Sequence, residues 1–152
     1  MARIMRRTWI SVVVAALALA GCAGGGPSRS EYEAEVQETR DRVDSALAHI
    51  TRAQSRPQLL SRMDDAALTI ERAAEDLDGA GAADGFEDET EALVKGLRQL
   101  SVDLAATAAQ VRQPEFGDLL GSGLSFESWD TVNGVFQKLR RQGIEVQPLA
   151  RH

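Results

Sequence analysis

The chain has 152 residues, of which 17 are basic and 23 acidic, giving a formal net charge of −6. This length is typical of one small domain that can bury a hydrophobic core. Every acidic residue follows residue 21, so the rest of the chain is more acidic than the total suggests. Phosphate backbones and anionic lipid head groups repel such a surface, which argues against nucleic-acid binding.

The amino-terminal segment has the three parts of a secretory signal. Arg3, Arg6 and Arg7 come first, an apolar run from Trp9 to Ala20 follows, and small residues close it. The run is only about 12 residues long, whereas a transmembrane helix needs about 20. We therefore expect an export signal, and a short anchor helix is the weaker alternative. The Arg6-Arg7 pair also leaves open whether export uses the general or the twin-arginine route.

The residues Leu19-Ala20-Gly21-Cys22 resemble a lipobox, the processing site of bacterial lipoproteins. The resemblance implies that the Cys22 sulfur receives a diacylglycerol, that a peptidase cleaves just before Cys22, and that a further acyl chain such as palmitate joins the new amino group. It covers residues 1–22 only and implies a cellular location and a membrane anchor, not an activity. Abundant Ala, Arg and Gly are typical of a GC-rich bacterium such as an actinobacterium.

The anchor divides the chain into three parts. Residues 1–21 are the expected signal peptide, 22–30 the lipidated cysteine and a flexible tether, and 31–152 a single helical-bundle domain. Two or more acyl chains hold a protein on a membrane durably. We therefore expect a location on the extracytoplasmic face of the cell membrane.

Three long amphipathic helices are predicted behind the tether. The first runs from Ser30, as N-cap of a capping box with Glu33, to Gln54. The second begins at Pro57 and stops at Asp78-Gly79, and the third runs from Glu87 or Asp88 to Pro114. Apolar residues recur at steps of three and four along them: Tyr32, Val36, Val43, Leu47 and Ile50; Leu60, Met63, Ala67, Ile70, Ala74 and Leu77; Leu93, Leu97, Leu100, Leu104, Ala108 and Val111.

A shorter fourth helix is predicted near the carboxyl end, where Phe126, Trp129, Val132, Phe136 and Leu139 return to helical spacing. Gly143 predicts a Schellman C-cap that joins Leu139 to Ile144. The tail from Ile144 to His152 is expected to be extended and to pack by Ile144, Val146 and Leu149. The predicted fold is all-α, an up-down-up bundle of three long helices with the fourth helix over one side.

Catalytic and metal-binding patterns are missing from the sequence. His49 has no second histidine one turn away, and His152 is terminal. No Glu-x-x-His, phosphate-binding loop or serine-nucleophile motif occurs. Most acidic residues fall on the solvent side of the apolar stripes. We therefore expect neither enzyme activity nor a metal or cofactor, although weak calcium binding around Asp84 to Glu91 remains an alternative.

Four aromatic residues cluster in the carboxy-terminal third: Phe116, Phe126, Trp129 and Phe136. Such rings can line a ligand groove or dock a partner. They can also seal the side of the bundle, and their helical spacing favours this packing role. Any ligand or partner surface is expected here and in the segment Gly117 to Gly123.

The resulting functional hypothesis is a lipid-anchored interaction or structural module that contacts another envelope protein or a wall component. The alternative is a lipoprotein that binds a small ligand or a metal through the aromatic segment or the acidic loop. In the predicted bundle the loop from Gly79 to Glu91 faces the bilayer. Because that loop is acidic, we expect the bundle to stand off the membrane.

Overall fold

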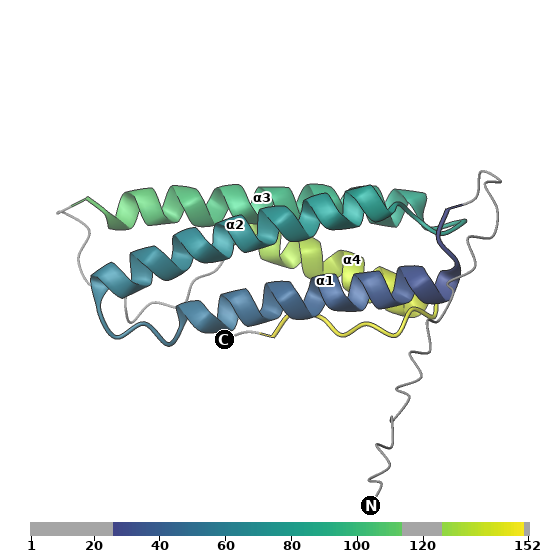
Figure 1. The fold of residues 1–152 in the computed structure, drawn as a ribbon, viewed down its shortest axis with the longest axis horizontal. Helices are drawn as coiled ribbons and strands as arrows, with labels where there is room; N and C mark the ends of the chain where they lie inside the picture. Colours follow the sequence, from purple (N-terminus) through teal and green to yellow (C-terminus); the bar gives the residue numbers. More distant parts are fainter. Residues whose placement is uncertain (1–25, 114–125, 151–152) are drawn as a thin grey trace, which may run out of the picture.

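The computed structural model describes residues 26–113 and 126–150. They form four helices, α1 (Arg29–Ile50), α2 (Arg56–Ala80), α3 (Glu87–Val111) and α4 (Glu127–Arg141), and contain no strand. Figure 1 shows three long helices lying side by side, with the shorter α4 against them. The predicted all-α fold with a shorter carboxy-terminal helix is therefore confirmed. None of the helices in the described ranges is long and apolar enough to cross a membrane.

The capping box of α1 begins two residues earlier than predicted. The N-cap is Ser28, whose Oγ accepts a hydrogen bond from the Glu31 backbone N–H at 3.3 Å, while Glu31 Oε2 accepts from the Ser28 N–H at 2.8 Å. The prediction that Ser30 caps this helix is therefore wrong. Two Ser-x-x-Glu patterns overlap here, and the helix uses the first. With this start Arg29 is the first helical residue, and its side chain donates to the carbonyl of Gln142, the C-cap of α4, at 2.8 Å.

The other predicted helix ends differ by a few residues. α1 ends at Ile50 rather than Gln54, because the chain must become extended at Ser55, the N-cap of α2. α2 continues past the expected stop at Gly79 to Ala80. The residue that ends it is Gly81, whose positive φ of 77° is favourable only for glycine.

The predicted apolar stripes form one continuous core. All predicted core residues of α1 and α3 are buried, as are those of α2 except Leu60. Leu60 is only partly buried, and Leu59, one turn before Met63, is buried in its stead. Between α2 and α3 the buried Ser101 hydroxyl donates to the Ala67 carbonyl at 2.9 Å. This bond supplies the polar partner that a buried hydroxyl requires.

Cross-helix ion pairs and hydrogen bonds show which parts of the long helices are neighbours. Arg98 of α3 pairs with Asp78 near the end of α2, whereas Arg112, just after α3, pairs with Asp64 near its start. Between α1 and α2, Arg42 pairs with Asp76. Near the carboxyl end of α1, the backbone carbonyl of His49 accepts a hydrogen bond from Arg62 of α2 at 3.0 Å.

The end of α4 has the predicted Schellman geometry. The Ile144 N–H donates to the Leu139 carbonyl at 3.1 Å, and the Gly143 N–H donates to the Arg140 carbonyl at 3.0 Å. Gly143 has a φ of 84°, which a glycine adopts without strain. Residues 144–150 have no regular secondary structure, and Ile144, Val146 and Leu149 are buried as predicted.

Candidate interaction surfaces

The predicted lipidation site lies outside the described residues. Leu19, Ala20, Gly21 and Cys22 all precede Gly26, where the description begins. Gly26 itself lies against the α2–α3 turn, because a Cβ added to it would come within 2.2 Å of the Ala82 carbonyl oxygen. The chain thus meets the helical bundle four residues after Cys22.

Aromatic and charged groups tie α1 to the α2–α3 turn and to α4. The Arg29 guanidinium lies 5.6 Å from the centre of the Phe86 ring and also holds the Gln142 carbonyl. The rings of Tyr32 and Phe86 lie 5.3 Å apart. The two rings are buried, so their contact stabilises this end of the bundle, whereas the exposed Arg29 guanidinium contributes less because water screens it.

A buried hydroxyl pair continues the same cluster. The Tyr32 hydroxyl and Thr90 Oγ1 are 2.8 Å apart, and Thr90 donates to the Phe86 carbonyl at 2.8 Å. The Tyr32 hydroxyl therefore donates its hydrogen bond to Thr90 Oγ1. Burial raises the pKa of Tyr32 above its ordinary value, although the hydrogen bond to Thr90 opposes that change. The arrangement fits a structural hydroxyl that stays protonated at neutral pH.

Glu89 of α3 is the only buried carboxylate among the described residues, and two groups from α4 and its C-cap satisfy it. Its Oε1 accepts hydrogen bonds from Lys138 Nζ at 2.7 Å and from Gln142 Nε2 at 2.9 Å. The Lys138 ammonium, and next the Gln142 amide, hold the pKa of Glu89 below its usual value. Glu89 is accordingly an ionised structural group that fixes α4 on α3.

The aromatic residues singled out from the sequence occupy different environments. Phe136 is fully buried, Trp129 is 9% exposed, and Phe126, the N-cap of α4, is partly buried against the core. Phe116 lies outside the described residues. The burial of Phe136 and Trp129 agrees with the packing role that their spacing favours, so the rings themselves present little surface to a partner.

Trp129 nevertheless has one polar atom without a partner. Its indole Nε1 is buried and makes no hydrogen bond in the part of the chain that the structure describes. The neighbouring Ser128 hydroxyl, by contrast, donates to Asp103 Oδ2 of α3 at 2.5 Å. A buried N–H without an acceptor costs about 1–3 kcal/mol.

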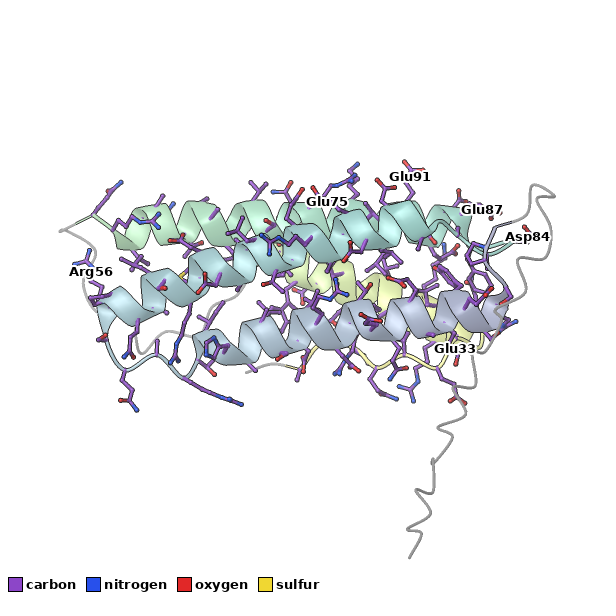
Figure 2. All side chains as sticks on the ribbon, viewed as in Figure 1. Glu33, Arg56, Glu75, Asp84, Glu87 and Glu91 are labelled. Atoms are coloured by element: carbon purple, nitrogen blue, oxygen red, sulfur yellow. The ribbon has the colours of Figure 1, made fainter. Side chains whose placement is uncertain are left out.

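Acidic side chains cover the outside of the bundle. In Figure 2 Glu33, Asp84, Glu87 and Glu91 lie toward the same end as the start of α1, whereas Arg56 lies at the opposite end. Asp84, Glu87 and Glu91 are exposed, and Glu33 is half-buried. In the described ranges no three His, Cys, Asp or Glu side chains come together as a metal-binding group. Weak calcium binding by the residues from Asp84 to Glu91 stays a prediction.

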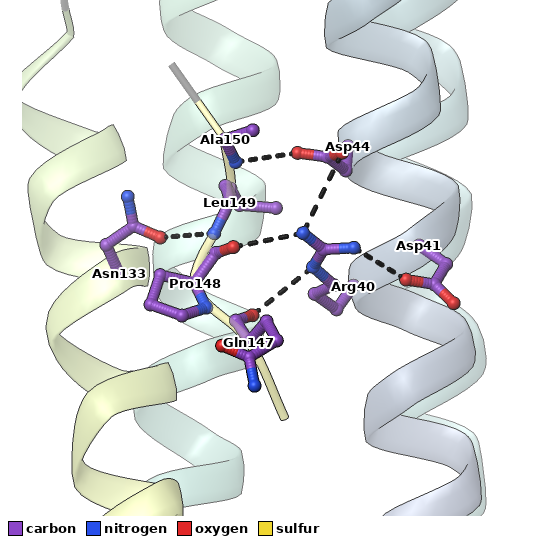
Figure 3. A network of polar contacts seen from close by, with 8 residues as sticks. All are labelled: Arg40, Asp41, Asp44, Asn133, Gln147, Pro148, Leu149 and Ala150. Carbon is purple, nitrogen blue, oxygen red and sulfur yellow. Dashed lines mark hydrogen bonds and ion pairs between the residues drawn. The ribbon is translucent and has the colours of Figure 1, made fainter. Parts of the chain in front are cut away.

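The described part of the carboxyl tail, Ile144–Ala150, is held by a site that the sequence did not indicate (Figure 3). Arg40 of α1 donates from Nε to the Gln147 carbonyl at 3.2 Å and from Nη2 to the Pro148 carbonyl at 3.1 Å. Asp44 Oδ1 accepts from the Ala150 N–H at 2.7 Å. Asn133 Oδ1 of α4 accepts from the Leu149 N–H at 2.7 Å. We call Arg40, Asp44 and Asn133 the tail seat.

The tail seat could not be found from local sequence patterns. Arg40 and Asp44 lie more than a hundred positions from the tail residues that they bind, and Asn133 lies on a different helix from them. All three are polar helix residues of ordinary type, and nothing in their local sequence marks them. The only available signal was the spacing of the three apolar residues Ile144, Val146 and Leu149 in an otherwise polar tail. That pattern predicted burial but not the surface that covers them.

Comparison with protein-family models, with curated proteins and with solved structures finds no match for this chain.

Proposed function

We propose that this protein is a bacterial lipoprotein, anchored by lipid on Cys22 to the extracytoplasmic face of the cell membrane. There it acts as a helical interaction or structural module that contacts an envelope protein or a wall component. The sequence Leu19-Ala20-Gly21-Cys22 supports the anchor. The structural observation that supports the proposal is the contact of Gly26, four residues after Cys22, with the α2–α3 turn at one end of the bundle.

The up-down-up order of the long helices belongs to the same proposal. The cross-helix pairs support it, because residues late in α1 neighbour the start of α2, and residues late in α2 neighbour the first half of α3. The α2–α3 turn then lies at the anchored end. Four peptide units between Cys22 and Gly26 span at most about 14 Å. The acidic anchored end is thus kept close to the bilayer but is repelled from anionic head groups.

This arrangement leaves the long sides of the bundle free for partners. Two large apolar residues are prominently exposed there, Leu68 of α2 (57%) and Val102 of α3 (58%). The buried polar side chains of Glu89, Thr90, Ser101 and Ser128 are engaged in structural hydrogen bonds. A binding role therefore explains the described surface better than catalysis does.

A small-ligand role is the second candidate, and the unpartnered Trp129 Nε1 favours it. After removal of the signal peptide Trp129 is the only tryptophan of the chain, since Trp9 lies within the signal. A ligand that accepts this N–H should shift the tryptophan emission and raise the melting temperature. A panel of candidate ligands that changes neither signal would argue against this candidate.

Photo-crosslinking in cells tests the interaction role. A photoreactive amino acid at Leu68 or Val102 should trap one defined envelope component in cells that carry the otherwise unchanged protein. The same substitution at buried Leu97 serves as the background control. Combination with Cys22→Ala should abolish the adduct, because the domain is no longer held at the membrane. If the exposed positions trap nothing beyond the Leu97 control, the proposed role is wrong.

A further inference from the structure

The tail seat recognises the main chain of the tail and not its side chains. Arg40 binds two carbonyl oxygens, while Asp44 and Asn133 each bind a backbone N–H. Main-chain hydrogen bonds of this kind provide affinity for any extended segment, whatever its sequence. The exposed side chains of Glu145 and Gln147 point away from the core. The seat therefore leaves sequence selection to the buried positions alone.

Three buried positions provide that selection. Ile144, Val146 and Leu149 are 1%, 1% and 4% exposed. They follow one another at steps of two and then three positions. An apolar residue is therefore required at the first, third and sixth places of the bound segment. Full burial of one aliphatic side chain contributes about 1.5–3 kcal/mol. Each of the three positions therefore selects strongly for an apolar side chain.

The tail also fills the space between two helices that otherwise hardly meet. α1 packs mainly on α2, and α4 on α3, while direct α1–α4 contact is minor. Figure 3 shows the tail lying between α4 and α1, with hydrogen bonds to each side. It is attached to the bundle through Gly143 at one end only within the described range. Its departure would therefore expose a ready-made site without breaking the α1–α2 or α2–α3 packing.

We propose that the tail seat is a binding site for an extended peptide segment of an envelope protein, with Ile144–Ala150 as its resident occupant. The partner segment carries apolar residues at the same three places and takes over the same four main-chain hydrogen bonds. This inference rests on the proposed interaction role and names the surface that performs it. The covalently attached tail acts at an effective concentration in the millimolar range, so it restrains binding until a better-matched segment arrives.

Peptide binding to a cut protein tests the site. A protease site inserted between Gly143 and Ile144 of the full chain allows the protein to fold first and the tail to be cut afterwards. A fluorescently labelled peptide of residues 143–150 should then exchange into the seat, and fluorescence anisotropy follows its binding. The uncut protein should bind at least about 10-fold more weakly, because its own tail competes. Equal binding to cut and uncut protein would overturn the proposal.

Matched variants show whether binding uses the proposed contacts. In the cut protein, Arg40→Ala should weaken peptide binding by about 10-fold or more, since two hydrogen bonds from a charged donor are lost. Arg42→Ala is the control on the same helix, because Arg42 pairs with Glu38 and Asp76 and not with the tail. In the peptide, Leu149→Asp should abolish binding, whereas Gln147→Ala should not change it. An equal response to both members of either pair would overturn the proposal.

A random peptide library displayed against the cut protein identifies the occupant. The enriched peptides should share apolar residues at their first, third and sixth places, and enrichment without this pattern would overturn the proposal. Light scattering of the uncut protein tests exchange of tails between two copies. A dimer that disappears when the tail is cut would assign the seat to a second copy and overturn the partner-segment proposal.

These outcomes are distinguishable from failure of the proposed function. The peptide measurements use purified protein and report on the seat alone, whereas crosslinking at Leu68 and Val102 reports on a partner in cells. Pattern-specific peptide binding without a crosslinked partner would support the seat and remove the cellular role proposed for those surfaces. A crosslinked partner without peptide exchange would remove the seat and leave the interaction role standing.

Discussion

Lys138 of α4 forms an ion pair with the buried carboxylate of Glu89 at 2.7 Å, and this pair joins α4 to the first turn of α3. Because Lys138 remains half-exposed, the pair is not a fully buried one. Glu89 depends on this ion pair more than Lys138 does, because the Glu89 carboxylate has little access to water. The same carboxylate also accepts the Gln142 amide next to the C-cap of α4.

Removal of the Glu89 charge should lower stability in a pH-dependent way. The pKa of Glu89 is lowered in the folded state, so its contribution is present above the unfolded pKa of about 4.3 and is lost as the pH falls through the folded value. At pH 7 we expect Glu89→Gln to lower the free energy of unfolding by about 1 kcal/mol.

Urea unfolding from neutral to acidic pH checks this prediction. The difference between the wild type and Glu89→Gln should shrink as the pH falls from the unfolded pKa of about 4.3 through the lowered pKa of the folded-state carboxylate. Glu87→Gln is the control, because Glu87 is exposed and its substitution should change stability by less than about 0.5 kcal/mol. A difference that is independent of pH would contradict an electrostatic role for Glu89.

The Tyr32 hydroxyl should titrate above its ordinary range. Tyr32 is the only tyrosine of the chain, so ultraviolet absorbance reports its ionisation directly. Because burial raises its pKa, we expect a midpoint above 10.0 in the folded protein and a return to about 10 in denaturant. Tyr32→Phe should reduce stability by about 1 kcal/mol through loss of the Thr90 contact. A folded-state midpoint equal to that in denaturant would contradict the buried position.

Two glycines of the α3–α4 pair should respond in opposite directions. A Cβ on Gly96 would come within 3.0 Å of Val132 Cγ2, whereas a Cβ on Gly134 would meet nothing within 4 Å. Gly96→Val should therefore destabilise the protein by about 1–3 kcal/mol through overpacking. Gly134→Ala should stabilise it by about 0.5–1 kcal/mol through helix propensity. Thermal unfolding measures both, and stabilisation by Gly96→Val would contradict the close approach of α3 and α4.

Features set by neighbouring residues could be predicted from the sequence. The stripe from Leu93 to Val111 and the Schellman motif at Gly143 both depend on spacing within one segment. The start of α1 could not be decided in this way, because Ser28 and Ser30 each have a glutamate three residues later. The contact between Arg29 and Gln142, 113 positions apart, distinguishes the two starts, and no local pattern contains it.

In the tail seat, too, only the features set by neighbouring residues could be predicted from the sequence. Burial of Ile144, Val146 and Leu149 could be predicted from their apolar character and spacing. The tail's hydrogen-bonding partners Arg40 and Asn133, however, lie on two different helices. A helix face with scattered polar residues does not reveal which backbone it will bind. The structure was required to bring these groups to one place.

Mass analysis of the mature amino terminus tests the lipoprotein assignment most directly. Protein purified from the membrane fraction of a bacterium that expresses the full chain should begin at Cys22 and carry a diacylglycerol on sulfur, with metabolic incorporation of a labelled palmitate analogue. Cys22→Ala should take up no label and accumulate as uncut precursor or as mislocalised protein. An unlipidated mature terminus, or a Cys22→Ala protein that is still cleaved and retained on the membrane, would contradict the account.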